Sequence, residues 1–532
     1  MKAKSIGVVV ALMVLIVVGW LVWPQSGRPA DYTVRIPLPA DIQTLDPAAL
    51  SDPTTARMLW QVYEGLVGLD ANNSIVPLIA ESWESQDDGR RWVFQIRDDV
   101  YFHPHPVFGG ERQTRAVVAK DVVWSWTKIG LGFGSFVFAG LVEGFNEFIQ
   151  GEAAEIAGIQ ATGEREVTIS LTRPDQSFIH RVSTQYLAVM PREVMEAEPD
   201  AFGRTVAIGT GPFRLVRASA TEIELARNEG YWRSTGGNVE RLVFRVEKNP
   251  QFRVTGLNSG HYDLVQVPLE LRSEFFEGDT LQPRLQQQFN AAVHGTFNVH
   301  YLGIDAAQVQ DAALRRALSL AVDREAVART LLSGGAVPAR GPVPPDMQAY
   351  VPPLDYGRDA AEARRALSGS SYDGEELDIL VSDAANHADV AQVVQGNLAD
   401  TGIRTRIDLV DFNTLVSRLF SDDRPPLFLA YSEWVFSAPE LIMGQFRSTA
   451  TPNPNLFGYA DKRVDALLDE IARTDDRTSI NTLCAEVEKI VGESPPAAWL
   501  YSERHSFVMD RRLSSLAITG NNHWLLEELR VD

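Results

Sequence analysis

Two histidines separated by one residue, His103 and His105 in the segment FHPHP, have the spacing that could place two ligands on one metal ion. Imidazole nitrogens are good ligands for zinc and other transition metals. No third ligand is evident nearby, and the prolines that flank the histidines favour an irregular backbone. We therefore interpret this segment as a surface loop, and the sequence predicts neither a metal site nor a cofactor.

Several enzyme motifs place a nucleophile or a phosphate in a recognisable sequence pattern. The chain contains no G-x-S-x-G, no H-E-x-x-H and no P-loop. The glycines at 130–134 lack the spacing of a dinucleotide-binding loop. Cys484 lies in NTLCAEVEKIV, a helical pattern in which cysteine behaves as a small apolar residue. We therefore predict a protein that is not an enzyme and has no catalytic residues.

The composition excludes further classes of function. The 532 residues carry a formal charge of −21, which argues against nucleic acid as a main partner because phosphate binding requires a basic surface. The single cysteine excludes an internal disulfide framework. Apolar residues make up 45% of the chain, as in an ordinary globular protein, and the length is enough for several domains.

The first thirty residues form a separate segment. Residues 6–23 are an unbroken run of 18 apolar residues and glycines, preceded by Lys2 and Lys4 and ending at Trp23. This length is close to that needed to cross a bilayer, and a positive flank keeps the N-terminus cytoplasmic. We expect an uncleaved signal anchor in preference to a cleaved signal peptide, since no small-x-small cleavage site follows. Residues 1–30 contain no acid, so the exported remainder would carry −24.

The rest of the chain contains segments with two different spacings of apolar residues, one typical of strands and one typical of helices. Apolar and polar residues alternate over short segments that predict strands. Other segments repeat apolar residues at helical spacing and predict helices. A proline-rich loop is expected at 341–356. This alternation predicts an α/β protein. The expected strands are 33–39, 90–102, 165–174, 221–228, 241–247 and 377–383, and the expected helices are 119–129 (with Asp121 as its cap), 311–332 and 460–474.

Five groups of motifs occur in a fixed order. Residues 44–103 contain LDP, YEGL, PLIAESW and WVFQIR, and AKDVVWSW follows at 119–126. GTGPFRLV and RNEGYW occur within 209–232, followed by NSGHYDL and later by RRALSLAVDR. Together they resemble family 5 of the bacterial extracellular solute-binding proteins, which includes the oligopeptide, dipeptide and nickel binders of ABC importers. The resemblance covers roughly residues 31–530.

The resemblance implies an α/β, bilobal periplasmic-binding-protein fold (type II, cluster C-like) with an additional domain that enlarges one lobe. The expected parts are residues 31–62, 187–296 and 500–532 for the core of lobe I, 63–186 for the additional domain, and 297–499 for lobe II. Such lobes close on a ligand about a hinge. The chain would then be the monomeric, periplasmic binding component of an ABC importer, which delivers a peptide or peptide-like solute to permease subunits in the inner membrane.

One departure from the family concerns the ligand. In peptide-binding relatives, an aspartate in a strand-loop segment pairs with the α-amine of the peptide. Residues 429–441 match this segment, and Val435 stands at the aspartate position. A buried ammonium without a counter-charge is costly. Either Glu433 replaces the aspartate or the ligand has no free amine. The expected ligand-binding residues are Glu433, Trp434 and Phe436, although the two aromatic side chains could instead pack between the lobes.

Two further points limit what the resemblance implies. The Asp-Gly that usually follows the Phe-x-x strand is replaced by HPHPVFGG, so metal or haem binding is not carried over from the family. The alternative to transport is a membrane-tethered sensor or scaffold that retains the binding fold, an option that the N-terminal anchor favours. Neighbouring permease and ATPase genes would favour transport over that alternative.

Overall fold

A computed structural model describes residues 32–347, 352–354, 357–383, 386–421, 424–451 and 454–532. The apolar run at 6–23, expected to be a signal anchor, lies outside these residues. Within them, no helix combines the length and the apolar character needed to cross a bilayer.

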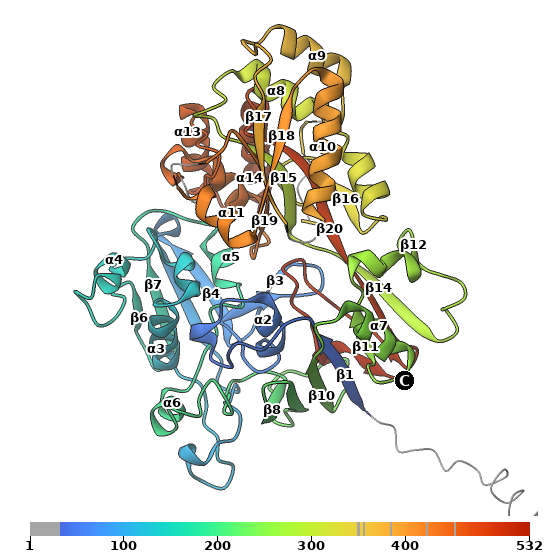
Figure 1. Cartoon of the computed structure of the whole chain (residues 1–532). Coiled ribbons are helices and arrows are strands. Elements are labelled where there is room, and N and C mark those ends of the chain that lie inside the picture. Colours follow the sequence, from blue (N-terminus) through green and yellow to red (C-terminus); the bar gives the residue numbers. More distant parts are fainter. Residues whose placement is uncertain (1–31, 348–351, 355–356, 384–385, 422–423, 452–453) are drawn as a thin grey trace, which may run out of the picture.

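The described chain forms two lobes, of which the upper one in Figure 1 is called lobe II and the lower one lobe I. The strands of lobe I form two four-stranded sheets, and a longer sheet extends from lobe II into lobe I. In spatial order, the first sheet consists of β1 (Thr33–Leu38), β10 (Arg241–Val246), β9 (Glu222–Arg227) and β8 (Phe213–Ala218). The second consists of β4 (Ala80–Gln86), β5 (Arg91–Ile96), β7 (Glu166–Ser170) and β6 (Ile159–Ala161).

The long sheet is organised around β20 (Ala497–Asp510), whose first half pairs with lobe II strands and whose second half pairs with lobe I strands. The boundary expected near residue 500 therefore falls inside a continuous strand, and the domain limits remain a proposal. The sheet runs β11 (Leu264–Gln266), β20, β15 (Asn298–Ile304), β19 (Leu427–Glu433), β17 (Leu377–Ser382) and β18 (Thr405–Val410), with β14 (Phe289–Gly295) and β16 (Ala336–Pro338) also paired to β20.

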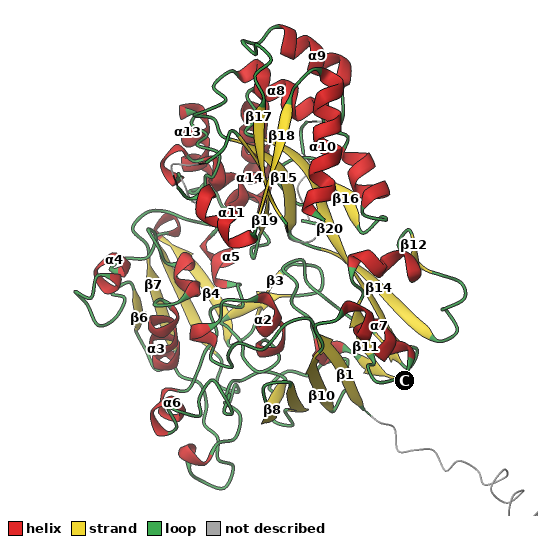
Figure 2. Cartoon of the chain, in the orientation of Figure 1, coloured by secondary structure: helices red, strands yellow, loops and turns green. Residues whose placement is uncertain are grey.

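Short ribbons and helices complete the fold, and Figure 2 shows helices flanking the lobe II sheet. The ribbons are β2 (Val67–Leu69) with β3 (Ile75–Pro77), β12 (Phe276–Glu277) with β13 (Thr280–Leu281), and β21 (Leu513–Ser514) with β22 (Arg530–Val531). The helices are α2 (Pro53–Leu59), α3 (Ala119–Ile129), α4 (Phe145–Ile149), α5 (Phe178–Val182), α6 (Arg192–Ala197), α7 (Pro250–Asn258), α8 (Ala312–Ala321), α9 (Ala360–Ser368), α10 (His387–Thr401), α11 (Phe412–Leu419), α12 (Pro439–Met443), α13 (Lys462–Ile471) and α14 (Arg477–Glu493).

The alternation of side chains along β17 explains how one sheet separates two cores in lobe II. Ile379 and Val381 pack in one apolar cluster, whereas Leu380 packs in another together with Tyr301 and Phe428. Successive side chains of a strand point to opposite faces, so a strand covered on both faces is apolar throughout. In lobe I, a single apolar cluster joins the β1 sheet to the β4 sheet.

The expected strands are confirmed as β1, β5, β7, β9, β10 and β17, and the expected helices 119–129 and 460–474 as α3 and α13. Asp121 does not occupy the N-cap of α3. It lies in the first turn, where its carboxylate accepts the backbone N–H of Val118 at 2.9 Å. The expected helix 311–332 is interrupted, because α8 ends at an extended Val322 and a second helical turn begins after Asp323, whose carboxylate accepts the N–H of Ala326.

The FHPHP segment is a loop with Pro104 and Pro106 exposed, as expected, but its histidines are buried: His103 is 1% exposed and His105 is 8% exposed. His103 donates from Nε2 to the carbonyl of Gly211 at 2.9 Å, and its Nδ1 faces the N–H of Gly209 at 3.4 Å. His105 Nε2 lies 3.2 Å from a carboxylate oxygen of Glu198. Both imidazoles therefore have local partners, and those of His103 hold this segment against the GTGPF turn.

We expect His103 to make the protein more sensitive to acid. Burial lowers the pKa of His103 to about 4, whereas the unfolded chain protonates histidine near pH 6.5. The neutral form thus contributes stability above pH 6.5, and this contribution is lost as the pH falls toward 4, at up to about 1.4 kcal/mol per pH unit. In urea unfolding at pH 7, 6 and 5, His103→Gln should flatten the pH dependence. The exposed His261→Gln should leave it unchanged, and equal slopes for the wild type and His103→Gln would contradict the assignment.

Candidate ligand-binding site

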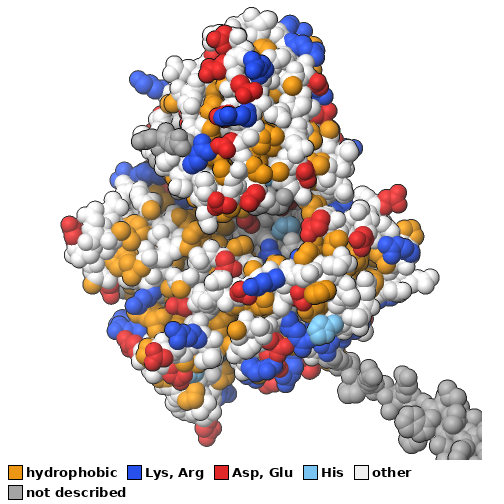
Figure 3. All heavy atoms as spheres, in the orientation of Figure 1, with side chains coloured by type: hydrophobic (Ala, Val, Ile, Leu, Met, Phe, Trp, Pro, Cys, Tyr) orange, Lys and Arg blue, Asp and Glu red, His pale blue; other side chains and the backbone are white. Residues whose placement is uncertain are grey.

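A cavity of about 600 Å³ lies between the two lobes, and we call it the interlobe cavity. Figure 3 shows a recess between the lobes, with apolar side chains around it. Side chains from both lobes line it, so a relative motion of the lobes would change its size. Lobe I contributes Ser51, Pro53, Trp60, Phe133, Tyr186, Asn521 and Asn522; lobe II contributes Ser382, His387, Phe412, Leu415, Val416, Leu419, Phe420, Leu429, Ala430, Tyr431, Glu433, Val435 and Leu456.

The strand β19 and the residue pair that follows it provide one part of the lobe II wall of the interlobe cavity. Leu429, Tyr431, Glu433 and Val435 all line the cavity. Their spacing of two residues places them on one face of the strand. Along the segment LAYSEWV, every second side chain therefore faces the cavity, in the order apolar, aromatic, acidic and apolar.

The backbone of β19 also presents an open edge to this region. Among the described residues, β17 pairs with β19 only at Leu427 and Phe428, whereas β15 pairs with the whole of β19. The N–H of Trp434 donates to the carbonyl of Phe297 on the β15 side. In an antiparallel pair, residues that are hydrogen-bonded to the partner strand, like Trp434, alternate with residues whose N–H and C=O point away from it. The N–H and C=O groups of Tyr431 and Glu433 therefore face away from β15.

The charge of Glu433 is held in an environment that disfavours it. The side chain contacts solvent in the cavity, but the surrounding walls of protein raise its pKa. The guanidinium of Arg57, on α2 of lobe I, opposes this effect, and the carboxylate of Glu503 adds to it. A positively charged group bound beside Glu433 would compensate for the lost hydration of this carboxylate.

The remaining walls of the interlobe cavity are mostly apolar and aromatic. Large apolar residues seldom gather on a surface without a partner. Here Tyr186 lies between lobe I rings, with centroid distances of 5.1 Å to Phe133 and 5.8 Å to Phe136. Across the cavity, α11 presents Phe412 and Phe420, which are 46% and 47% exposed. The cavity can therefore accept apolar side chains or planar groups of a ligand.

A histidine of β15 and a glutamate of β20 lie beside β19 in the same sheet. His300 Nε2 lies 3.2 Å from a carboxylate oxygen of Glu503, and the imidazole stacks on Tyr501 at 4.3 Å and on Tyr431 at 5.1 Å. Burial acts to raise the pKa of Glu503, but His300 lowers it to about 2, so this carboxylate is charged at neutral pH. Within the described residues, no group of three or more His, Cys, Asp or Glu side chains is arranged to hold a metal ion.

The structure places the three expected ligand-binding residues differently. Glu433 lines the interlobe cavity, whereas Trp434 and Phe436 are not among its lining residues. Phe436 is 7% exposed and packs against Phe136 of lobe I at 5.9 Å, with the guanidinium of Arg181 5.7 Å from its ring. In this structure Phe436 therefore joins the lobes by packing, and ligand contact by the three residues remains a prediction.

The sequence does not predict the aromatic lobe I wall or the exposed face of α11. Residues 412–420 repeat apolar side chains at i, i+3, i+4, i+7 and i+8. This pattern predicts one apolar helix face. It does not indicate that the face borders a cavity, because a buried face has the same pattern. A free strand edge likewise has no signature in the sequence.

Comparison with known proteins identifies the family. The model described as "Bacterial extracellular solute-binding proteins, family 5 Middle" matches residues 74–453. Probable di/tripeptide-binding protein 5 of Pseudomonas aeruginosa is 25% identical over 449 residues, 82% of this chain and 83% of that protein. Heme-binding protein A of Haemophilus influenzae is 23% identical over 458 residues, with 82% and 80% covered.

A solved structure shows the same fold. The unliganded open form of the periplasmic murein tripeptide-binding protein MppA has a TM-score of 0.79 at 18% identity, with 94% of this chain and 97% of that chain covered. The expected bilobal α/β fold and the resemblance inferred from the motifs are confirmed. The chain belongs to family 5 of the bacterial extracellular solute-binding proteins, a family of binding proteins that is not defined by catalysis.

Proposed function

We propose that this protein captures a peptide or peptide-like solute in the interlobe cavity and delivers it to the permease of an ABC importer. The observation that supports this most is the open edge of β19 beside Glu433. An extended peptide can add to such an edge through main-chain hydrogen bonds, while its alternate side chains enter neighbouring pockets. The names of two of the similar proteins, a di/tripeptide-binding and a murein tripeptide-binding protein, support the same class of solute.

The proposal assigns a role to each wall of the cavity. Main-chain groups of Tyr431 and Glu433 bind the peptide backbone, and the Glu433 carboxylate binds the α-ammonium group. The apolar walls accept side chains without sequence-specific hydrogen bonds, so several peptides could bind. We propose further that the protein acts in the periplasm, tethered by residues 1–30, as a monomer that contacts permease subunits and catalyses no reaction.

The ligand class can be tested on purified protein by native mass spectrometry followed by calorimetric titration. We expect a mixture of retained peptides, and titration with unmodified tripeptides should give saturable binding. Haemin is the competing ligand suggested by the heme-binding relative. Saturable binding of haemin, without binding of any peptide, would overturn the peptide proposal.

The role of the strand edge can be tested separately with Tyr431→Pro. Proline removes the backbone N–H that faces the cavity, and proline is tolerated on an edge strand when that N–H is not part of the ladder. Tyr431→Ala is the matched control because it removes the same ring and keeps the N–H. We expect peptide affinity to be at least about fivefold lower in Tyr431→Pro than in Tyr431→Ala, as for the loss of one hydrogen bond. Equal affinities would exclude pairing at this residue.

A further inference from the structure

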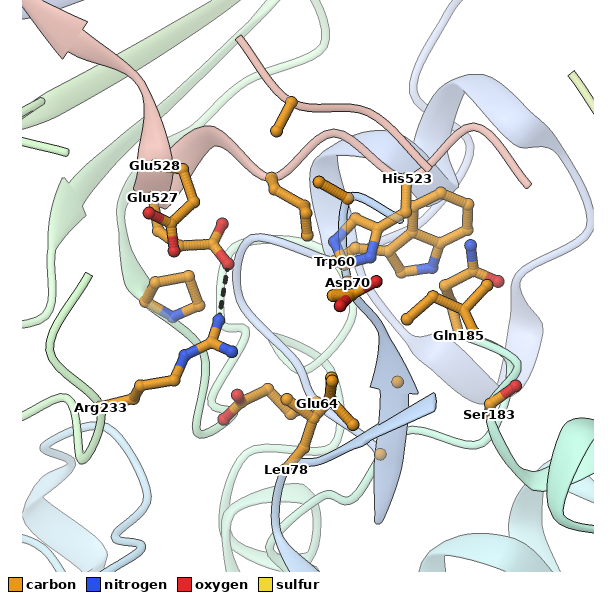
Figure 4. Close-up of a pocket in the computed structure, with 18 of the residues that line it drawn as sticks. Trp60, Glu64, Asp70, Leu78, Ser183, Gln185, Arg233, His523, Glu527 and Glu528 are labelled. Atoms are coloured by element: carbon orange, nitrogen blue, oxygen red, sulfur yellow. Dashed lines mark hydrogen bonds and ion pairs between the residues drawn. The ribbon is translucent and has the colours of Figure 1, made fainter. Parts of the chain in front are cut away.

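A second cavity, of about 510 Å³, lies within lobe I, and we call it the lobe I cavity. It is formed by the segment after α2, the β2–β3 ribbon, residues 183–185, the segment after β9 and the C-terminal segment 515–530. Figure 4 shows Glu64, Arg233, Glu527 and Glu528 on one side of it and Trp60, Gln185 and His523 on the other. The interlobe cavity and this one share Trp60 and Asn521 as lining residues, so the two cavities adjoin at these side chains.

The charged groups around the lobe I cavity are unbalanced. Four carboxylates line it, from Glu64, Asp70, Glu527 and Glu528, against two guanidinium groups, from Arg233 and Arg530. Arg233 is already paired with Glu527 at 3.0 Å, as the dashed line in Figure 4 shows. An anionic ligand would meet three further carboxylates, whereas a cation would meet complementary charge.

Burial and this surplus both disfavour the charged form of the buried carboxylates. The pKa of Glu527 is raised to about 7, chiefly by burial; Glu528 and Glu64 act in the same direction, and the charge of Arg233 opposes them. Burial also raises the pKa of Glu64, although Tyr231 and Thr210 each donate a hydrogen bond of 2.8 Å to its carboxylate. Because burial lowers the pKa of His523 to about 3, that imidazole adds no positive charge.

Polar atoms without partners also line this cavity. Among the described residues, Oγ1 of Thr184 and Oε1 of Gln185 have no hydrogen-bond partner, and the Thr184 side chain is 1% exposed. A buried polar atom without a partner is costly, so such atoms usually mark a place for water or a ligand. Both oxygens can accept a hydrogen bond from an N–H group. The β2–β3 ribbon adds apolar surface through Val67, Leu69 and Leu78.

We infer that the lobe I cavity binds an alkylammonium or alkylguanidinium group, with its apolar stem against the β2–β3 ribbon and its cationic head among the carboxylates. Because the two cavities adjoin at Trp60, the group would most simply be the side chain of a basic residue of the solute held in the interlobe cavity. This part of the inference rests on the proposed function. A free diamine offers the same chemistry, and the experiment separates the two sources.

The test compares tripeptides that carry lysine or norleucine at each of the three positions, together with free cadaverine. Norleucine retains the alkyl stem and lacks the charge. For at least one position, we expect the wild-type protein to bind the lysine peptide at least about tenfold more tightly than the norleucine peptide. The double variant Asp70→Asn/Glu528→Gln keeps oxygen acceptors for the N–H groups of Asn72, Ser74 and Gly236. In this variant we expect the preference to fall below about threefold.

The matched control is Glu147→Gln/Glu155→Gln, which removes the same charge from exposed sites of lobe I outside both cavities. It should retain the preference, and thermal unfolding should show that both double variants are folded. If lysine peptides show no preference, but cadaverine stabilises the wild type and not Asp70→Asn/Glu528→Gln, the site binds a free amine.

Three outcomes each decide against one proposal. If tripeptides bind without any preference for lysine, and cadaverine leaves the melting temperature unchanged, the cation site is overturned and the proposed function stands. If no tripeptide binds, the proposed function fails, and the cadaverine measurement alone then decides on the lobe I cavity. A preference that persists in Asp70→Asn/Glu528→Gln would also overturn the assignment of the cation to this cavity.

Discussion

Glu433→Gln should weaken the binding of a free-amine peptide by at least about tenfold, or about 1.4 kcal/mol. The substitution keeps the size of the side chain and removes its charge. In the wild type this side chain is exposed to the cavity, and the surrounding walls of protein already raise its pKa. An ammonium group that binds there forms a charge pair shielded from solvent, and the loss of one partner leaves the other without compensation.

A comparison of free and N-acetylated peptides identifies the group that Glu433 binds. Acetylation removes the ammonium charge, so it should weaken binding to the wild type and have little further effect on Glu433→Gln. The matched control is Glu376→Gln, an exposed carboxylate of lobe II outside the interlobe cavity. Calorimetry measures the affinities of the wild type and of Glu433→Gln for the free and for the acetylated peptide. If acetylation weakens binding to wild type and Glu433→Gln equally, another residue binds the amine.

Gly209→Ala should destabilise the protein by about 3 kcal/mol or more. The GTGPF turn lies against the segment that follows α2, and the N–H groups of Gly211 and Phe213 donate to the carbonyls of Val62 and Gln61, each at 2.9 Å. A Cβ on Gly209 would lie 2.1 Å from the carbonyl oxygen of Val62. Since the obstacle is backbone, the two segments must separate and lose these hydrogen bonds.

Gly396→Ala is the matched control for this effect. Gly396 lies in the middle of α10 on its exposed side, and no atom lies within 4 Å of an added Cβ. Alanine there should stabilise the protein by up to about 1 kcal/mol, through helix propensity alone. Urea unfolding monitored by circular dichroism measures both variants. Equal effects of the two substitutions would show that close approach at Gly209 does not stabilise the fold.

The regular elements could be predicted where local pattern and tertiary packing agree. In segments such as 222–227 and 462–471 the apolar residues recur at regular spacing and form one buried face, and these segments form β9 and α13. The segment 311–332 has a helical pattern throughout, but Asp323 competes as a cap and ends the helix early. His103 was misjudged because burial depends on what packs against the loop, which no local pattern records.

Less of the candidate site could be predicted. Glu433 was found because the sequence around it resembles a known segment and because a carboxylate was missing at Val435. Trp434 and Phe436 lie one and three residues after Glu433 in sequence, but alternation along the strand and the turn that follows direct them toward protein. Tyr186 and Phe412 come from distant segments, and their approach to β19 is a property of the fold. The lobe I cavity likewise combines residues 60–78 with residues 515–530.

The position of β20 has a consequence for the biosynthesis of this chain. Strands β11, β14, β15 and β16 all pair with it, yet β20 comprises residues 497–510 of 532. Until the ribosome has released nearly the whole chain, these strands have no partner on that side, and unpaired edges promote aggregation. Neither half of the protein can complete the long sheet before β20 is synthesised, so a factor that holds the nascent chain unfolded would protect both halves until β20 arrives.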